Sequence, residues 1–517
     1  MRISVAAMSY SRSQSTTRTG SGIAWLARLF SFPVMCMFLL AAVIFGFCVK
    51  QFAEPDMWWH LRYARDLVQL HTFSSFDTYS FTAAGAFRPN FEWLSELPFY
   101  VAYHMAGLHG VLLLYFGILV LMFAGVYYLS CSDGADCKNA TVATLIGIFL
   151  CVVSIGPRTL LFGWLCMVGL LLVLDRFRRS RTGLWLLPPL FLLWINLHPS
   201  WAFGLVVFLL TIGAGLVDGE WGLVEATKWS RDELRKLAIA FVASVMVLFV
   251  NPFGYRLVLY PFQFLFQQQS NVRYVEEWQG VDFSTSNGKL ALLVLLGLLA
   301  ANVFLRRRWR LDQALLCAFA LWAALSHSRF LFFAGLVLPP ILAQRLNLFP
   351  PYEPELDKPW LNGIIMAAIV ASLVFFFPTN AALQQQLNEN FPTAALAFMQ
   401  RQHLNGRIFN QYRWGGFMEW NSPELKPFID GRADIFVDKG VLDDHRRVTL
   451  LDDPFGVLDK YRIDYVLVQS DGAITYLLNH SQDWHPLYAD NVAVLFARSE
   501  AAVTQAPIVS ELARTPN

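Results

Sequence analysis

The chain has 517 residues, of which 56% are hydrophobic and 15% are charged. Soluble domains carry about 25% charged residues, so this composition excludes an ordinary soluble protein and predicts a polytopic membrane protein. The net charge of +2 says nothing about nucleic acid, but the sequence contains no basic patch interleaved with aromatic residues, as a nucleic-acid-binding face would require, so no nucleic-acid partner is expected. None of the seven cysteines lies beyond residue 317, which excludes a disulfide framework in the C-terminal part.

Hydropathy predicts about eleven transmembrane helices between residues 27 and 379, each built on an apolar run. A span needs roughly 20 apolar residues. The runs lie near 27–49, 109–130, 140–156, 159–175, 183–197, 200–217, 237–252, 289–305, 312–326, 330–345 and 361–378. Residues 1–26 are rich in Ser, Thr and Arg and predict a disordered cytoplasmic tail, with a transit peptide as the alternative.

The positions of Lys and Arg predict the orientation, because cytoplasmic loops carry an excess of both. With eleven spans, the basic clusters all fall on one side, at 2–28, 138, 176–181, 228–236, 306–310 and 345–358. The N-terminus is then cytoplasmic, and residues from about 380 onward lie outside the inner (plasma) membrane. The outer connections instead carry acids, histidines and single arginines.

The first outer loop, residues 50–108, opens on Glu54-Pro55-Asp56-Met57-Trp58-Trp59-His60-Leu61-Arg62. A helix that begins at Pro55 would place Asp56, His60 and Tyr63 on one face. An acid and a histidine in this arrangement could take and relay a proton. The alternative is an amphipathic helix at the membrane interface, with its two tryptophans as headgroup anchors.

The rest of the outer side adds order and further polar groups. Residues 61–70 predict a short helix, 73–82 an extended segment, and 90–107 a second helix with Glu92 and Glu96 on one face. Later outer connections contribute Arg158, Asn196, His198, Glu276, Glu277, His327 and Arg329. Ionisable groups near membrane depth are costly and usually face a cavity or a partner, so these positions predict a functional site.

Beyond residue 380 the composition becomes that of a soluble domain. Apolar runs of strand length lie at 407–410, 426–430, 464–468 and 492–497, with helical patterns near 392–404, 441–461 and 472–480. This alternation predicts a small α/β domain over residues 380–505, followed by a disordered tail at 506–517. Asp430, Arg432 and Asp434 in one of its turns could bind a ligand or form a salt-bridged structural turn. The sequence contains no P-loop, G-x-G-x-x-G, H-E-x-x-H or G-x-S-x-G motif.

These residues resemble a known family. A multi-spanning bundle whose first outer loop opens on an acid beside Trp-Trp-His is similar to the GT-C superfamily of membrane glycosyltransferases. Within it, the chain resembles poorly characterised bacterial proteins with a P-D-x-W-W-H-L first loop, a following Glu-Trp-Leu, and an outer α/β domain carrying F-I-D-G-R-x-D. The matching positions are Pro55–Leu61, Glu92–Leu94, Arg158, Asn196–His198 and Phe428–Asp434. The adjacent Asp-Glu of some superfamily members is here Glu54-Pro55-Asp56.

The resemblance implies an inverting transfer from a polyprenyl-phosphate sugar on the outer membrane face, with Asp56 as general base. A lipid phosphate leaving group needs positive charge, and Arg158 and Arg329 could supply it; interfacial snorkelling is the alternative for both. His60, His198 and Asn196 could orient the base or the phosphates. Glu92 could pair with an arginine or help to hold a divalent cation. Carboxylates alone would suit Mg²⁺ or Mn²⁺, but nothing in the sequence fixes a metal.

Three other functions stay open. A transporter or flippase of a lipid-linked intermediate should carry polar residues through the bilayer midplane, whereas the span centres here are mostly Leu, Val, Phe and Ala. A polysaccharide polymerase or ligase typically holds its large outer loop between late spans. A catalytically inactive membrane scaffold would not depend on Asp56. The sequence does not identify the sugar or the acceptor.

Overall fold

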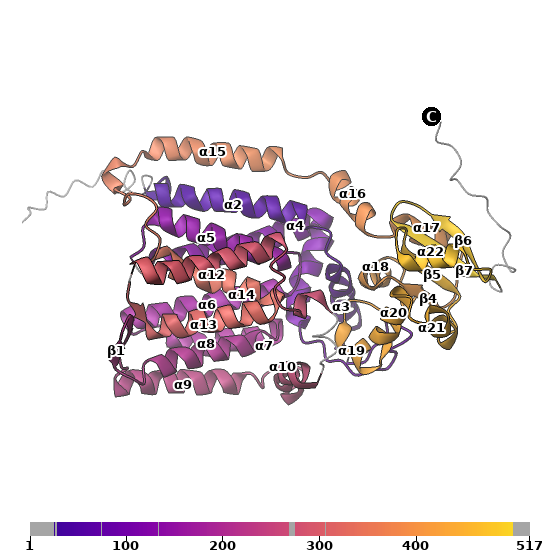
Figure 1. Cartoon of the computed structure of the whole chain (residues 1–517), viewed down its shortest axis with the longest axis horizontal. Helices are drawn as coiled ribbons and strands as arrows, with labels where there is room; N and C mark the ends of the chain where they lie inside the picture. Colours follow the sequence, from indigo (N-terminus) through magenta and orange to yellow (C-terminus); the bar gives the residue numbers. More distant parts are fainter. Residues whose placement is uncertain are drawn as a thin grey trace, which may run out of the picture.

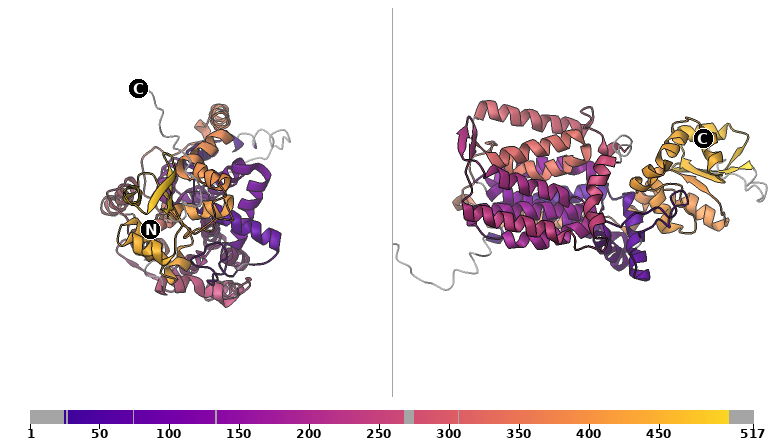
Figure 2. Two further views of the ribbon diagram at one scale, coloured as in Figure 1. Left: turned by 90° about the vertical axis from the view of Figure 1, so that its right-hand side faces the viewer. Right: turned by 90° about the horizontal axis from the view of Figure 1, so that it is seen from below.

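The computed structural model describes residues 25, 28–73, 75–132, 134–267, 275–305 and 307–499. The predicted tail at 506–517 and nearly all of the one at 1–26 lie outside these ranges. Figure 1 shows a bundle of roughly parallel helices with a smaller α/β domain at one end. The first outer loop lies between the two parts, and the view from below in Figure 2 shows the same order.

The bundle contains a helix at each of the eleven predicted apolar runs. Within the described residues, four helices are long and apolar enough to cross a membrane, or five if the bent pair Pro359–Phe375 and Asn380–Asn390 is one span; the count of eleven spans stays a prediction. The helices are α2 (Phe32–Lys50), α4 (Trp93–Ser132), α5 (Cys137–Cys151), η1 (Val152–Ser154), α6 (Leu160–Ser180), η2 (Leu184–Leu186), α7 (Leu187–Leu197), α8 (Trp201–Ala214), α9 (Arg231–Val247), α10 (Tyr255–Gln267), η3 (Glu276–Trp278), α12 (Ser286–Leu305), α13 (Leu311–Ser326), η4 (Ser328–Phe330), α14 (Leu331–Ala343), η5 (Pro354–Leu356) and α15 (Pro359–Phe375). A small sheet of β1 (Gly219–Trp221), β2 (Val224–Ala226) and β3 (Trp309–Arg310) joins two connections at the end away from the α/β domain (Figure 1).

Helices α5 and α14 cross at two glycines in the centre of the bundle. A methyl group at Gly147 would stand 2.3 Å from the Gly335 carbonyl oxygen, and one at Gly335 would stand 2.5 Å from the Gly147 carbonyl oxygen. In a membrane, helices associate through close packing of small residues, since lipid tails are as apolar as leucine. The two glycines therefore let the backbones of α5 and α14 touch.

Replacing Gly147 with Ala should separate this crossing. The added methyl group meets backbone rather than a movable side chain, so we expect a loss of roughly 1–3 kcal/mol and a lower melting temperature in lipid nanodiscs. Gly117→Ala in α4 is the matched control, because nothing lies within 4 Å of a methyl group there. Equal melting temperatures for the two variants would contradict the close crossing.

The first outer loop folds as the sequence predicts at its start. Helix α3 (Asp56–Leu70) begins one residue after Pro55 and contains the predicted helix at 61–70. The extended segment forms one β-bridge, between Phe76 and Phe87. Helix α4 then begins at Trp93 and is broken at Ala106 and Gly107, so its first part is a separate segment before the long span.

The C-terminal domain is a four-stranded sheet with helices on both faces. Its elements are α16 (Asn380–Asn390), α17 (Thr393–Arg401), β4 (Ile408–Asn410), η6 (Tyr412–Trp414), α18 (Gly415–Asn421), α19 (Ala433–Asp438), α20 (Val441–Thr449), α21 (Pro454–Lys460), β5 (Tyr465–Gln469), α22 (Ala473–Asn479), β6 (Trp484–Ala489) and β7 (Ala493–Arg498). The strand order is β4-β5-β7-β6, with β4 parallel to β5 and the other pairs antiparallel. Tyr465 and Leu467 pack in one cluster and Val466 and Val468 in another, so both faces of β5 are buried.

Two predictions for this domain are wrong. The run at 426–430 is not a strand, because only Pro427 forms a bridge, to Ile408, and the chain then turns toward the first outer loop. The helix at 441–461 is two helices, α20 and α21, since Leu451 and Asp453 between them adopt positive φ angles. The prediction also missed β6, whose Pro486 and exposed residues mask the strand pattern.

Candidate active site

Asp56 is the first residue of α3 and lies where the bundle, the first outer loop and the C-terminal domain meet. Its Oδ1 accepts a hydrogen bond from Trp59 Nε1 at 3.3 Å, one helical turn further on. Its Oδ2 lies 3.9 Å from Arg158 Nε. The Asp56 side chain is 30% exposed, so a substrate can reach it.

Arg158, in the connection between α5 and α6, forms ion pairs with three carboxylates. Its Nε lies 2.9 Å from Glu54 Oε1, and its Nη1 donates to Glu277 Oε1 at 2.6 Å. The third carboxylate is that of Asp56. One guanidinium balances one of the three negative charges, so ionising all three carboxylates is unfavourable.

The pKa values reflect this imbalance. Burial raises the pKa of Asp56 and that of Glu54, and Arg158 opposes both changes. Burial also opposes the ionisation of Glu277, but the charges of Arg158 and Arg329 outweigh it and hold the pKa of Glu277 below its ordinary value. Asp56 is therefore a stronger base than an exposed aspartate, while Glu277 stays ionised.

Arg329, in η4, is a second cation at the same place. Its guanidinium lies 4.2 Å from the centre of the Trp278 ring, and none of the described carboxylates forms an ion pair with it. Burial lowers the pKa of Arg329, and the nearby charge of Arg158 adds to this effect, although the carboxylates of Glu277, Glu92 and Asp56 oppose it. Arg329 is thus a partly exposed cation that has no ion-pair partner among the described carboxylates.

A second polar network lies behind Asp56, around His60. The Nδ1 atom of His60 is 3.0 Å from Glu96 Oε1, and its Nε2 is 3.1 Å from Thr159 Oγ1 and 3.7 Å from Glu92 Oε2. The other oxygen of Glu92 is 3.3 Å from His198 Nε2. No described contact joins Asp56 to His60, so the two share a helix face but belong to different networks.

Burial keeps this second network mostly uncharged. It lowers the pKa of His60 well below 6.5 and that of His198 to about 3. It raises the pKa of Glu92 to about 7 and that of Glu96 well above its ordinary value. Both imidazoles are therefore neutral at pH 7, Glu96 is protonated, and Glu92 is protonated below about pH 7, so the network avoids most of the cost of a buried charge.

The raised pKa of Glu92 predicts a pH-dependent stability. The folded state favours protonated Glu92, so this contribution is complete below about pH 4.5 and is lost as the pH rises through about 7. The change amounts to about 3 kcal/mol. We expect Glu92→Gln to remove this part of the pH dependence when melting temperatures are measured from pH 5 to 8. Glu389→Gln, at an exposed position of α16, is the control; parallel curves for wild type and Glu92→Gln would refute the assignment.

Arg432 connects the C-terminal domain to the first outer loop. Its Nη1 donates to Asp77 Oδ1 at 2.6 Å and to Tyr63 Oη at 2.9 Å, and its Nε donates to Asp430 Oδ1 at 2.7 Å. Its Nη2 donates to Glu419 Oε1 at 3.1 Å. The side chain is fully buried, so these contacts support the salt-bridged structural turn rather than a ligand site at Arg432.

Asp434 forms a second connection of the same kind. Both of its oxygens accept from Arg88 Nε, at 3.1 and 2.9 Å, and its Oδ2 also accepts from Tyr260 Oη at 3.1 Å. Arg88 belongs to the first outer loop and Tyr260 to α10. The turn of Asp430, Arg432 and Asp434 therefore holds the C-terminal domain on the loop that carries Asp56.

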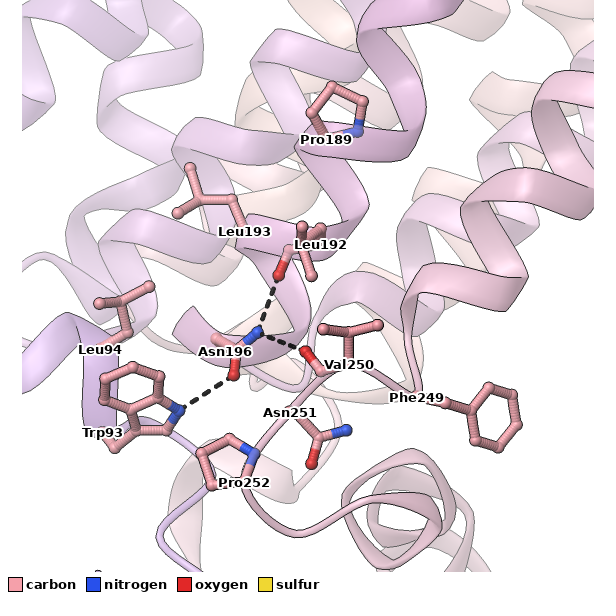
Figure 3. A pocket seen from close by; sticks show the side chains of 10 residues that line it. All are labelled: Trp93, Leu94, Pro189, Leu192, Leu193, Asn196, Phe249, Val250, Asn251 and Pro252. Carbon is pink, nitrogen blue, oxygen red and sulfur yellow. Dashed lines mark hydrogen bonds between the residues drawn. The ribbon is translucent and has the colours of Figure 1, made fainter.

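The hydrogen-bond partners of Asn196 lie outside this site. Asn196 accepts a hydrogen bond from Trp93 Nε1 at 3.1 Å, and its Nδ2 donates to the carbonyl oxygens of Leu192 and Val250. This amide lies in the wall of an open, mostly apolar pocket of about 760 Å³. Figure 3 shows its hydrogen bonds to Trp93, Leu192 and Val250. The structure thus brings together Asp56, Arg158, Arg329, Glu92, His60 and His198, but places Asn196 on the neighbouring cavity.

Several residues of the site lack a sequence signal. Glu54 and Glu277 look like ordinary loop acids, and Glu277 approaches Arg158 only through the fold. Arg88 stands in no motif. The side chain of Glu276 lies outside the described part. Glu96 is the exception, because its spacing of four residues from Glu92 on a predicted helix already places the two together.

The carboxylates nearest Asp56 do not fit a divalent cation. Glu54, Asp56 and Glu277 converge on the Arg158 guanidinium, which takes the central position that a cation would need. Within the described ranges, no group of three or more His, Cys, Asp or Glu side chains is arranged to hold a metal. The prediction of Mg²⁺ or Mn²⁺ therefore finds no support in these residues.

No family model and no curated protein matches the chain. Among solved structures, the oligosaccharyltransferase of Archaeoglobus fulgidus in its apo form is 12% identical over 84% of this chain and 69% of that chain, with a TM-score of 0.47. The oligosaccharyltransferase AglB from Archaeoglobus fulgidus, in complex with an inhibitory peptide and a dolichol-phosphate, is 10% identical over 93% of this chain and 75% of that chain, with a TM-score of 0.48. ArnT from Cupriavidus metallidurans bound to undecaprenyl phosphate is 14% identical over 93% of this chain and 98% of that chain, with a TM-score of 0.45.

Proposed function

We propose that the protein is a membrane glycosyltransferase that moves a sugar from a polyprenyl-phosphate donor to an acceptor hydroxyl, with Asp56 as general base. The observation that carries this proposal is the Asp56 carboxyl with its raised pKa, reachable by substrate and close to the cations Arg158 and Arg329. All three stand at the end of the bundle that faces the C-terminal domain. A base and two cations at a membrane boundary suit a substrate whose phosphate lies at that boundary.

The chemistry would run as a single displacement. Asp56 takes the proton of the acceptor hydroxyl while its oxygen attacks the anomeric carbon, and the bond from that carbon to the phosphate oxygen breaks on the opposite face, with inversion. The lipid phosphate leaves with one more negative charge. Positive groups placed where this charge develops lower the barrier.

The two arginines have different parts in this proposal. Arg158 is already engaged by Glu54 and Glu277, so it holds Asp56 in place. Arg329 has no described ion-pair partner and can bind the phosphate without first breaking one. The network of His60, Glu92 and His198 lies beside these groups and could orient the phosphate.

The orientation of the site follows the distribution of positive charge in the sequence. If the basic connections are cytoplasmic, the site and the C-terminal domain lie on the outer, periplasmic side of the inner membrane. A transporter would need polar groups through the bilayer, and the charged clusters described here gather at one end of the helices instead. This arrangement favours chemistry at the surface over transport.

Asp56→Asn tests the base. It keeps the shape of the side chain and its contact with Trp59, so we expect normal folding and donor binding but a loss of about 10²–10⁴-fold in transfer of label from radiolabelled polyprenyl-phosphate sugars. In wild type, kcat/KM should rise with pH, with a midpoint above the ordinary pKa of aspartate, because Asp56 acts in its ionised form. An equally fast Asp56→Asn variant would refute the assignment of the base.

Arg329→Leu tests the phosphate site. Because it removes a partly desolvated charge that has no ion-pair partner among the described residues, we expect the melting temperature to stay level or rise, while the KM for the donor increases about tenfold or more. Inhibition by a short polyprenyl phosphate should weaken in parallel. Arg256→Leu is the control, since Arg256 is an exposed arginine of the same side; equal changes in both variants would point to nonspecific attraction.

A further inference from the structure

A loop of the C-terminal domain touches the carboxyl of Asp56. This loop, Asp430-Gly431-Arg432, is called the DGR loop below. A methyl group at Gly431 would stand 2.2 Å from Asp56 Oδ1 and 3.0 Å from Trp59 Nε1. Contacts of Cβ atoms under 3.0 Å are essentially never seen. Asp56 can therefore occupy its position only because residue 431 has no side chain.

The backbone does not explain this glycine. Glycine is often needed where φ is positive, as at Gly440 with a φ of 70°. Gly431 is not among the positive-φ glycines, so an alanine could adopt its backbone conformation. The requirement at position 431 is one of space, and the group that fills the space is the carboxyl of Asp56.

The DGR loop is also held in place by hydrogen bonds, so it cannot readily move away from Asp56. The backbone N–H of Arg432 donates to Asp430 Oδ1 at 2.8 Å, and the Arg432 side chain is fixed to Asp77 and Tyr63 of the first outer loop. Moving this loop would pull a fully buried guanidinium from its carboxylates, which is strongly destabilising. A side chain at position 431 would therefore displace the Asp56 carboxyl rather than the loop.

Asp56 is held from the other side by the bundle. Trp59 Nε1 and Arg158 Nε contact its two oxygens. Trp59 is itself packed against the C-terminal domain, since a methyl group at Gly416 would stand 3.1 Å from its ring. The Asp56 carboxyl thus lies between one cation of the bundle and one glycine of the C-terminal domain.

We infer that Gly431 is a positioning residue that sets the place of the Asp56 carboxylate, and that the C-terminal domain forms the outer wall of the active site through it. The consequence for catalysis rests on the proposed function; the steric contact does not. A carboxylate pushed aside by about 1 Å loses its alignment with the acceptor hydroxyl, and such misplacement can cost about 10²-fold in rate.

The test is a double-mutant cycle on stability, which needs no activity. Gly431→Ala is made in wild type and in the Asp56→Ala background, where the carboxyl is absent. We expect the melting temperature to fall by at least about 2 °C in wild type and to match the control Gly117→Ala in the Asp56→Ala background. The same loss in both backgrounds, or no loss in either, would overturn the inference.

The kinetic arm uses the full-length protein in nanodiscs. We expect Gly431→Ala to lower kcat about tenfold or more while the KM for the donor changes less than about twofold, because the Arg329 site is untouched. A rise in KM with unchanged kcat would overturn the positioning role. If wild type transfers no sugar from any donor, the proposed function fails, while the stability cycle still decides whether Gly431 places Asp56.

Discussion

The part of the protein next to the C-terminal domain depends on two guanidinium groups, one partly exposed and one fully buried, each surrounded by carboxylates from distant parts of the chain. Arg158 gathers Glu54, Asp56 and Glu277, while Arg432 gathers Asp77, Asp430 and Glu419. A charge taken out of water costs several kcal/mol unless partners surround it. Arg158 therefore depends on the segment between α2 and α3, the start of α3 and η3, whereas Arg432 depends on the contact between the first outer loop and the C-terminal domain.

The two clusters differ in their access to solvent, and this difference separates structure from chemistry. The side chain of Arg432 is 0% exposed, whereas those of Arg158 and Asp56 are 18% and 30% exposed. No substrate can reach Arg432 without unfolding its surroundings. Asp56 combines an open face with a pKa raised by burial, as a general base requires. The closed cluster fixes the C-terminal domain, and the open cluster is available for reaction.

The contact between Gly431 and Asp56 joins these two clusters. Arg432, beside Gly431, anchors the DGR loop, and Arg158 holds Asp56 from the opposite side. The C-terminal domain is then more than an appendage to the bundle, because the position of one carboxylate depends on both. Behind Asp56, the network of His60, Glu92 and His198 adds polar groups that carry little buried charge, because both imidazoles are neutral and Glu92 is protonated below about pH 7.

Much of the site could be predicted from the sequence, because local spacing carries it. A helix from Pro55 fixes which face Asp56 and His60 share, and the bias of positive charge separates the basic end of the bundle from the end with acids and histidines. Asn196 shows where this reasoning fails. Its position close to His198 in the sequence suggested a common role. Helix α7 ends at Leu197, between the two residues, and the Asn196 amide lines an apolar pocket instead.

By itself, the sequence determined a helical membrane protein with a C-terminal α/β domain. It also singled out Asp56, His60, Glu92, Arg158 and Arg329. Both results follow from local properties of the chain, namely its hydrophobic periodicity and the rarity of charged residues beside apolar runs. Only the tertiary structure decided which carboxylate meets which arginine, that Arg432 is an anchor, and that Gly431 makes room for Asp56. These contacts join residues that are hundreds of positions apart in the chain. Local sequence spacing cannot predict such contacts, because only the packing of the folded chain brings these groups together.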